Sequence, residues 1–315
     1  MSRVCAIVVT YNSADAIEAC VAPLLEAGAD VIVVDNASPD STAALVRDRL
    51  PQVELIANAD NRGFPAAVNQ GAARGLSNTL LLVNPDCVVP AKTVRALDAF
   101  LEEHPDVGLV APRLREDDGS IQISAHPLGS FSTLLANRAR RVLPRALGDR
   151  FGESYDVCLN ATEPTDVGMM IAACVAIRRD LLEQIGGLDE GYFMYLEDME
   201  LCLQVRRAGY RVVYVPTVEA RHVGGASSGD RSHVWPHHSR SLLRFHARHR
   251  PRTFQLVRAT LIGRAVLGMG LGLGQDALAA ARHQPPRRKA LAWARVAGIA
   301  VRHGRSRAAS DWRQA

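Results

Sequence analysis

Polar residues follow four apolar runs in the first third of the chain, at the point where each run ends. The four clusters are Thr10-Tyr11-Asn12, Asp35-Asn36-Ala37-Ser38, Asn61-Arg62-Gly63-Phe64 and Asn84-Pro85-Asp86. One such cluster could be a simple turn, because Asn, Asp and Pro all favour turns. Four clusters that a parallel sheet would bring to one edge favour a ligand site, since these sheets bind ligands beyond the carboxyl ends of their strands.

The absence of two glycine-rich motifs limits the chemistry of this site. No G-x-G-x-x-G or G-x-x-x-x-G-K follows any apolar run, so the dinucleotide-binding and P-loop interpretations lose their main support. A phosphate-binding site must then neutralise charge in another way. A divalent cation held by carboxylates is the most economical choice, and the oxygens of Asp86 suit Mg²⁺ or Mn²⁺.

Two further groups of residues could do chemistry, each with an ordinary structural alternative. The stretch YLEDMEL places Glu197, Asp198 and Glu200 within four positions, which is costly repulsion unless a cation lies nearby. A carboxylate in a first helical turn is also stabilised by the helix dipole alone. His222 precedes two glycines, and we expect it on a flexible loop near the same edge, although a lone histidine is more often structural.

Alternating strand and helix patterns would position these residues. Continuous apolar runs separated by helical spacing indicate a mostly parallel sheet that helices cover on both faces. We expect strands within residues 4–9, 30–38, 53–58, 79–86, 107–114, 166–187 and 211–216, and helices within 14–27, 38–50, 64–76, 91–104, 166–187 and 195–210. Beyond Trp235 the chain is expected to be helical only.

Composition divides the chain into an acidic part and a basic part. The 315 residues carry a net charge of +4, but residues 236–315 contain 16 Lys and Arg against 2 Asp and Glu, which is +14 and leaves −10 for residues 1–235. We expect one domain over 1–235, with a loop-rich insertion at about 120–164, and a helical extension over 236–315. The six scattered cysteines lack a C-x-x-C pair and favour buried free thiols over a zinc site or disulfides.

The basic extension suggests an anionic partner, with a solvated helical surface as an equal alternative. Nucleic acid is disfavoured because only 5% of the chain is aromatic, too few for stacking platforms. An anionic membrane surface is the remaining candidate. The uncharged stretch Ala265–Gln275 is too short for the ~20 apolar residues of a spanning helix, so we expect surface association rather than a transmembrane span.

Several motifs occur together in an order that resembles a known family. The motifs are AIVVTYNS, VIVVDNASPDST, NRGFPAAVNQG, LLVNPDCVV, GYFMYLEDMELCLQVRRAGYRVVYVP and RHVGG. In this order they resemble family 2 glycosyltransferases, and most of all bacterial rhamnosyltransferases of cell-wall and polysaccharide assembly. The resemblance covers about Val4 to Ser228 and implies an α/β GT-A fold, with a Rossmann-like, mostly parallel central sheet flanked by helices.

The resemblance also implies a role for each matching residue. A nucleotide-sugar donor would be bound by Thr10, Tyr11, Asn12, Asp35, Arg62, Gly63, Asn69, Asn84 and Asp86. Asp86 and His222 would hold the divalent metal, Mg²⁺ or Mn²⁺, and Glu197-Asp198 would match the catalytic pair, with Asp198 as the general base. Asn84 stands where the family's D-x-D motif has its first aspartate, so its role stays open.

The activity implied by the resemblance is an inverting, metal-dependent sugar transfer. We expect dTDP-L-rhamnose as the donor, with UDP-galactofuranose or a UDP-N-acetylhexosamine as alternatives, and a polyprenyl-diphosphate-linked sugar or a cell-surface glycan as the acceptor. We expect a cytoplasmic protein held peripherally at the inner face of the membrane by its basic extension. Homo-oligomerisation is left open, and a non-catalytic binding protein with a basic tail is the alternative from another class.

Overall fold

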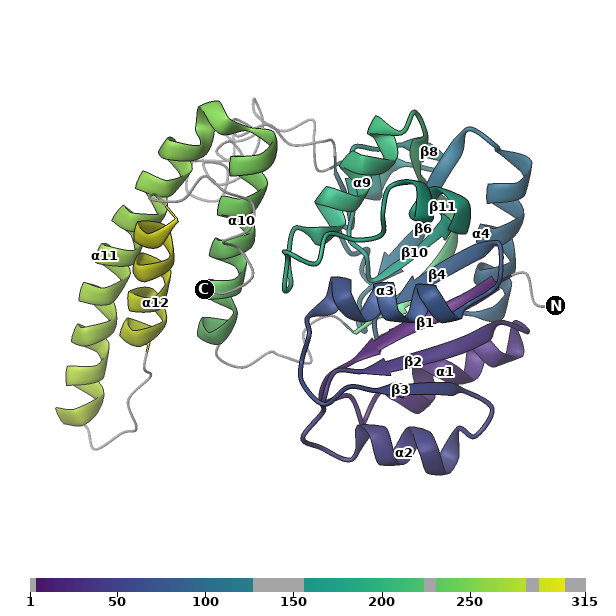
Figure 1. Ribbon diagram of the computed structural model, residues 1–315, viewed down its shortest axis with the longest axis horizontal. Coiled ribbons are helices and arrows are strands. Elements are labelled where there is room, and N and C mark those ends of the chain that lie inside the picture. The colour runs from purple at the N-terminus through teal and green to yellow at the C-terminus, as the bar shows by residue number, and fades with distance from the viewer. Residues whose placement is uncertain (1–3, 127–155, 224–230, 282–288, 304–315) are drawn as a thin grey trace. The chain divides into compact units, whose positions relative to one another are not determined.

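The computed structural model describes residues 4–126, 156–223, 231–281 and 289–303. The chain forms two compact units (Figure 1). The first unit consists of Met1–Asp189 and Asp198–Ala226, and the second of Glu190–Glu197 and Ser227–Ala315. The expected helical extension therefore lies within the second unit, which also takes a short segment from the middle of the chain. Much of the expected insertion at 120–164 lies outside the described residues.

A mixed, mostly parallel sheet forms the centre of the first unit. Its strand order is β3-β2-β1-β4-β10-β6-β11-β5, and β8 pairs with β11. Strands β1 to β4 are parallel to one another, whereas β10 runs antiparallel between β4 and β6. The bounds are β1 Val4–Thr10, β2 Asp30–Asp35, β3 Glu54–Ala57, β4 Thr79–Val83, β5 Cys87–Val88, β6 Val107–Arg115, β8 Thr165–Asp166, β10 Cys174–Arg178 and β11 Arg211–His222, with a separate pair of β7 Ala125–His126 and β9 Met169–Met170.

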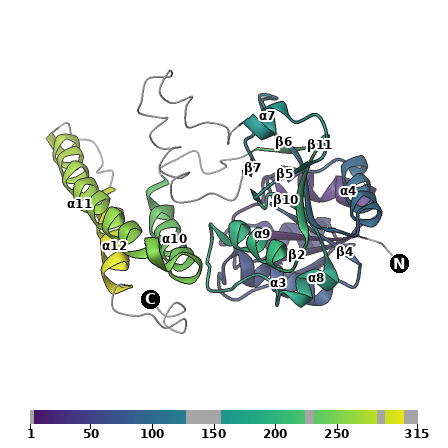
Figure 2. The same ribbon diagram turned by 90° about the horizontal axis from the view of Figure 1, so that it is seen from above.

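Helices cover both faces of this sheet, as the unbroken apolar strands predict. Alternate residues of β1 enter different cores, with Val8 on one face and Ile7 on the other. The first core takes side chains from α1 Ile17–Glu26, α2 Thr42–Arg49 and α4 Ala91–Glu103. The second takes them from α3 Phe64–Arg74, α7 Asp156–Asn160, α8 Arg179–Gln184 and α9 Glu197–Arg207, and Figure 2 shows α3, α8 and α9 on one side of the sheet and α4 on the other.

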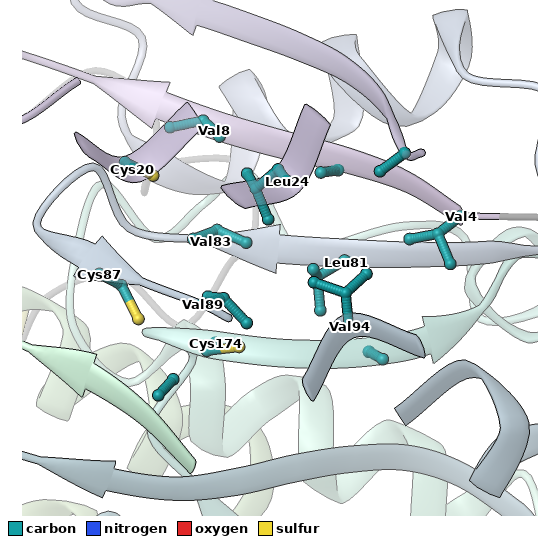
Figure 3. Close-up of a cluster of buried hydrophobic side chains, with 14 of the residues drawn as sticks. Val4, Val8, Cys20, Leu24, Leu81, Val83, Cys87, Val89, Val94 and Cys174 are labelled. Atoms are coloured by element: carbon teal, nitrogen blue, oxygen red, sulfur yellow. The ribbon is translucent and has the colours of Figure 1, made fainter. Parts of the chain in front are cut away.

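The first core contains three thiols beside the end of β4 (Figure 3). Cys20, Cys87 and Cys174 are fully buried, and the Sγ of Cys20 donates a hydrogen bond to the carbonyl of Asn84 at 3.5 Å. Burial raises the pKa of the Cys20 thiol well above its usual value. All six cysteines are buried and free, which confirms the prediction of unpaired thiols.

The sequence wrongly placed His222 on a loop. It is the last residue of β11 and is paired with Cys87 of β5. We expected this strand to stop at Pro216, because proline is rarely tolerated inside a sheet. The register between β11 and β6 shifts between Val215 and Glu219, and this irregularity accommodates the proline while the strand continues.

Where the structure describes it, the second unit is helical beyond Trp235, as expected. It contains the 3₁₀ turn η2 Arg231–Val234 and the helices α10 Trp235–His249, α11 Pro251–Ala281 and α12 Lys289–Arg302. Glycines let α11 and α12 approach closely. A Cβ at Gly268 would lie 2.3 Å from the Trp293 ring, and one at Gly272 would lie 2.7 Å from the backbone nitrogen of Ala290.

Helix α11 is more apolar over its length than we expected. By length and composition, its segment Pro251–Asp276 could cross a membrane. The prediction of surface association rests on the short uncharged stretch Ala265–Gln275, but Arg264 is the single charged residue between Ala259 and Gln275. Leu267, Leu271 and Leu273 are each more than 60% exposed on this helix. The same composition occurs in core helices of soluble proteins, so it is weak evidence for a span.

Candidate active site

The carboxyl ends of β1 and β2 meet in one hydrogen-bonded cluster. Thr10 and Asp35 are register partners, and both are buried. Thr10 Oγ1 donates to Asp35 Oδ1 at 2.8 Å, Ser38 Oγ donates to the same oxygen at 2.5 Å, and the Ser38 amide donates to Oδ2 at 3.0 Å. Asp35 therefore closes the turn after β2, and its carboxylate, which can accept about four hydrogen bonds, keeps capacity for one more.

Tyr11 and Asn12 lie where β1 leaves the sheet. The Tyr11 side chain is 51% exposed. Asn12 adopts a left-handed backbone conformation with φ of 56°. Its backbone amide donates a hydrogen bond to Ser38 Oγ at 3.0 Å. A left-handed asparagine is uncommon outside turns and functional loops. The two turns are thus tied together through Ser38, a member of the second polar cluster for which the sequence predicted no separate role.

Gly63 begins α3 beside the same cluster. Its φ of 82° lies in the left-handed region that favours glycine. Its amide donates to Asn61 Oδ1 at 3.0 Å, and its carbonyl accepts from Asn36 Nδ2 at 3.1 Å. Arg62 is exposed in this turn, so its cationic side chain is available to an anionic ligand.

Asn69 has partners within the fold. Its Nδ2 donates to the carbonyl of Leu188 at 2.9 Å, and its Oδ1 accepts from the Leu188 amide at 2.9 Å. A Cβ on Gly187 would lie only 2.7 Å from the same Oδ1. The side chain therefore fastens α3 to the turn after α8, and the predicted donor contact has to compete with these bonds.

Asp86 and His222 are brought together by the short pairing of β5 with β11. His222 Nε2 lies 3.3 Å from Asp86 Oδ1, and the Val223 amide donates to the Asp86 carbonyl at 3.0 Å. Asn84, two residues before Asp86, donates its backbone amide to the Ala173 carbonyl at 2.9 Å. These backbone bonds fix the turn between β4 and β5 against its neighbours.

A hydrogen-bonded chain sets the orientation of the His222 ring. Gln122 Nε2 donates to Glu116 Oε1 at 2.9 Å, so the amide oxygen of Gln122 faces the ring. That oxygen lies 2.8 Å from His222 Nδ1, and Nδ1 must therefore carry the proton. In the neutral ring, Nε2 is then unprotonated, and its lone pair faces the Oδ1 of Asp86. Two acceptors at this distance require either a proton or a cation between them.

This arrangement fits a divalent metal that is only partly enclosed by protein. Within the described residues, no three or more His, Cys, Asp and Glu side chains are grouped so that they could hold a metal ion. Mg²⁺ is commonly held by one or two carboxylates together with substrate phosphates, and a second hydrogen bond that orients a ligating histidine is typical of metal sites. Asp86 and His222 could thus provide the protein's share.

The charge state of Asp86 suits this role. Partial burial alone would raise its pKa, but the hydrogen bond and the positive charge that His222 can provide outweigh burial and lower the pKa. Asp86 is therefore an anion at neutral pH, which a metal ligand of this kind must be.

Asp198 lies in the first turn of α9, and its pKa is raised, whereas that of Asp86 is lowered. Burial raises its pKa to about 6, although its Oδ1 accepts a hydrogen bond from the Met199 amide at 2.7 Å. A carboxylate with a pKa near the working pH is a suitable general base. Its neighbour Glu197 belongs to the second unit, so the pair spans the junction between the units along the chain.

One cavity of the first unit lies away from these residues. It measures about 580 Å³ and is lined by residues at the opposite ends of the strands, among them Thr79, Arg178 and Arg179. The residues that the sequence singled out on β1, on β2 and after β4 lie at the carboxyl ends of these strands and not in this cavity.

Comparison with known proteins places the chain in a family. The model of glycosyl transferase family 2 matches residues 5–186. An N-acetylglucosaminyl-diphospho-decaprenol L-rhamnosyltransferase of Mycobacterium tuberculosis is 30% identical over 262 residues, which is 77% of this chain and 84% of the relative.

Two solved structures share the fold. Mannosyltransferase PcManGT from Pyrobaculum calidifontis, in complex with GDP-Man and Mn²⁺, matches with a TM-score of 0.54 and 20% identity over 95% of this chain and 86% of that protein. GalNAc-T7 with UDP, GalNAc and Mn²⁺ also gives 0.54, at 15% identity over 78% of this chain and 50% of that protein. The chain therefore belongs to glycosyl transferase family 2, has the GT-A fold that its motifs predicted, and is a glycosyltransferase similar to rhamnosyltransferases.

Proposed function

We propose that the chain is an inverting, metal-dependent rhamnosyltransferase. The observation that carries this proposal is the pair of Asp86 and His222, 3.3 Å apart, with the His222 ring oriented by Gln122. This pair follows β4 on the same rim as Thr10 and Asp35. A nucleoside-diphosphate sugar needs both a base-recognition site and a site that neutralises its phosphates, and this rim offers residues for each.

Each residue has a defined task in the proposed reaction. Asp198 takes the proton of an acceptor hydroxyl, whose oxygen then attacks the anomeric carbon. The bond from that carbon to the diphosphate breaks, and the nucleoside diphosphate leaves with the bonding electron pair. Asp86 and His222 would hold a divalent cation, which neutralises the diphosphate charge when bound. Arg62, exposed beside Gly63, supplies a further cation on the donor side.

We propose dTDP-L-rhamnose as the donor and a polyprenyl-diphosphate-linked sugar as the acceptor. The relative from Mycobacterium tuberculosis, by its name, transfers L-rhamnose to a decaprenyl-diphosphate-linked N-acetylglucosamine. The shared motifs cover the region that would bind the donor. The Asp35 carboxylate can accept one more hydrogen bond, and the imide N–H of thymine could donate it. Uracil has the same N–H group, so uridine donors are the alternative.

A donor panel tests this proposal. The full chain is incubated with dTDP-L-rhamnose, UDP-galactofuranose or UDP-N-acetylglucosamine, together with a short-chain polyprenyl-diphospho-N-acetylglucosamine, in Mn²⁺ or in EDTA. We expect release of dTDP and a rhamnosylated lipid in Mn²⁺ only. Product from a uridine donor alone would overturn the donor assignment, and equal rates in EDTA would overturn the metal assignment.

We further propose that the second unit binds an anionic membrane surface from the cytoplasmic side. Residues 236–315 carry a net charge of +14, and polybasic segments are attracted to anionic lipid headgroups. Leu267 and Leu271 are exposed beside Trp235, Trp293 and Arg264, which line a groove of about 290 Å³. Exposed leucines next to tryptophan and arginine are typical of helices that lie in a membrane interface. This placement would bring the enzyme to a lipid-linked acceptor.

A further inference from the structure

The eight residues before Asp198 are packed on helix α10 of the second unit. Glu190–Glu197 belongs to that unit, and aromatic and polar contacts join it to α10. The Phe193 ring stacks on the His237 ring with centroids 4.7 Å apart, and the Tyr195 ring lies 5.8 Å from that of His238. Ser241 Oγ donates to the Met194 carbonyl at 2.9 Å. One face of α10 thus contacts most of the segment.

Arg244 contacts two residues of the segment, Gly191 and Tyr192. A Cβ on Gly191 would lie 2.1 Å from the Arg244 Cζ, so the guanidinium lies directly against the glycine backbone. The same guanidinium lies over the ring of Tyr192, 5.3 Å from its centroid, and Tyr192 is only 1% exposed. A cation over a buried aromatic ring is held more firmly than one at an exposed site.

The backbone of this segment is strained at its end. Tyr195 and Leu196 both adopt left-handed conformations, with φ of 66° and 64°. This conformation is unfavourable for residues other than glycine, because the Cβ atom comes too close to the following carbonyl oxygen. Two in succession persist only where the surrounding structure holds them, and the bond from Ser241 to Met194 acts on the residue directly before them. The peptide bond after Glu197 then leads into Asp198.

We propose that α10 is the template that holds residues 190–197 in the conformation from which Asp198 is presented, with Arg244 as its principal positioning residue. The inference rests on the proposed role of Asp198 as the general base. It gives the second unit a task in the chemical step itself, in addition to any role at a membrane.

The test compares Arg244→Met with a control on the same helix. Arg248 is exposed, and Arg248→Met removes the same charge outside the contacts described above. For Arg244→Met we expect kcat to fall by roughly 10- to 100-fold, because small displacements of a reacting group have effects of that size. The donor KM stays within about twofold, since the donor residues lie in the other unit. Arg248→Met should leave both constants unchanged.

Hydrogen exchange gives a readout that does not depend on activity. We expect faster amide exchange in residues 190–197 of Arg244→Met, and unchanged exchange in β1 and β4. Unchanged exchange in 190–197 would overturn the inference whatever the donor proves to be. A different result would be faster exchange in residues 190–197 of Arg244→Met while the separate variant Asp198→Asn keeps full activity. This result would overturn Asp198 as the base and would still support the packing of residues 190–197 on α10.

A second substitution keeps the inference testable if Arg244→Met does not fold. Gly191→Ala displaces the guanidinium from the other side of the contact, and should reproduce the loss of kcat. The double variant Gly191→Ala/Arg244→Lys should be no worse than Gly191→Ala alone, because both changes break one contact. Additive losses in kcat would show that the two residues act separately, and would overturn the inference.

Discussion

Asp198 is a carboxyl group whose ionisation is opposed by its surroundings. Burial raises its pKa to about 6, compared with 3.8 for an ordinary aspartate. Between these pH values the folded chain holds the proton more tightly than the unfolded chain does. The stabilisation from the protonated group is therefore complete below about pH 3.8 and is lost as the pH rises through about 6.

Replacing Asp198 with asparagine should therefore abolish transfer and stabilise the protein. We expect loss of turnover with donor binding retained, and a gain of roughly 1–3 kcal/mol at pH 8 that disappears near pH 4. Thermal unfolding at the two pH values measures the gain. The wild-type enzyme should lose activity as the pH falls below about 6. Turnover by the variant near the wild-type rate would show that another group is the base.

Gln122 shows how a residue outside the recognised motifs can belong to the site. It orients the His222 ring and is itself oriented by Glu116. Gln122→Leu should weaken Mn²⁺ binding by roughly 10- to 100-fold, the usual effect of losing such a partner. Calorimetric titration of Mn²⁺ into the chain with nucleoside diphosphate present measures this, and Gln52→Leu at an exposed position is the matched control. Equal affinity in both variants would remove Gln122 from the site.

At the scale of elements, one side chain of α3 fastens this helix to the turn after α8. Asn69 makes both side-chain hydrogen bonds to the Leu188 backbone, and loss of partly buried hydrogen bonds of this kind costs about 1–3 kcal/mol. Asn69→Ala should lower the midpoint of thermal unfolding while the donor KM changes little. A large rise in the donor KM at unchanged stability would support the donor contact that the family resemblance implies.

The elements that the sequence predicted well are those with strong local patterns. β1, β2 and β4 are unbroken apolar runs because both of their faces are buried, and their polar ends meet at one rim as expected. β5 has only two residues and so has no periodicity. It nevertheless pairs with β11 and brings His222 to Asp86. Gln122 lies in a segment of weak pattern, where no local signal could have pointed to it.

At the scale of the whole molecule, charge and exposed leucines define the expected membrane surface. The variant Leu267→Glu/Leu271→Glu should reduce sedimentation of the protein with vesicles of phosphatidylglycerol by at least tenfold. Vesicles of phosphatidylcholine should bind the wild type weakly, because electrostatic attraction needs anionic lipid. Leu76→Glu, at a position 84% exposed in the first unit, should have no effect. If the double variant abolishes dimers in light scattering while vesicle binding persists, this face joins copies of the chain instead.

The interleaving of the two units has a consequence for biosynthesis. Residues 190–197 are synthesised well before α10 Trp235–His249, the helix on which they pack. Domains generally begin to fold during synthesis, from the N-terminal side. The carboxyl-end rim belongs to the first unit, so it can form on the ribosome before α10 has been synthesised. At that stage residues 190–197 still lack the helix on which they pack. If α10 is the template proposed above, we expect the growing chain to bind nucleotide sugar before it can transfer the sugar, and to gain activity only after α10 has emerged.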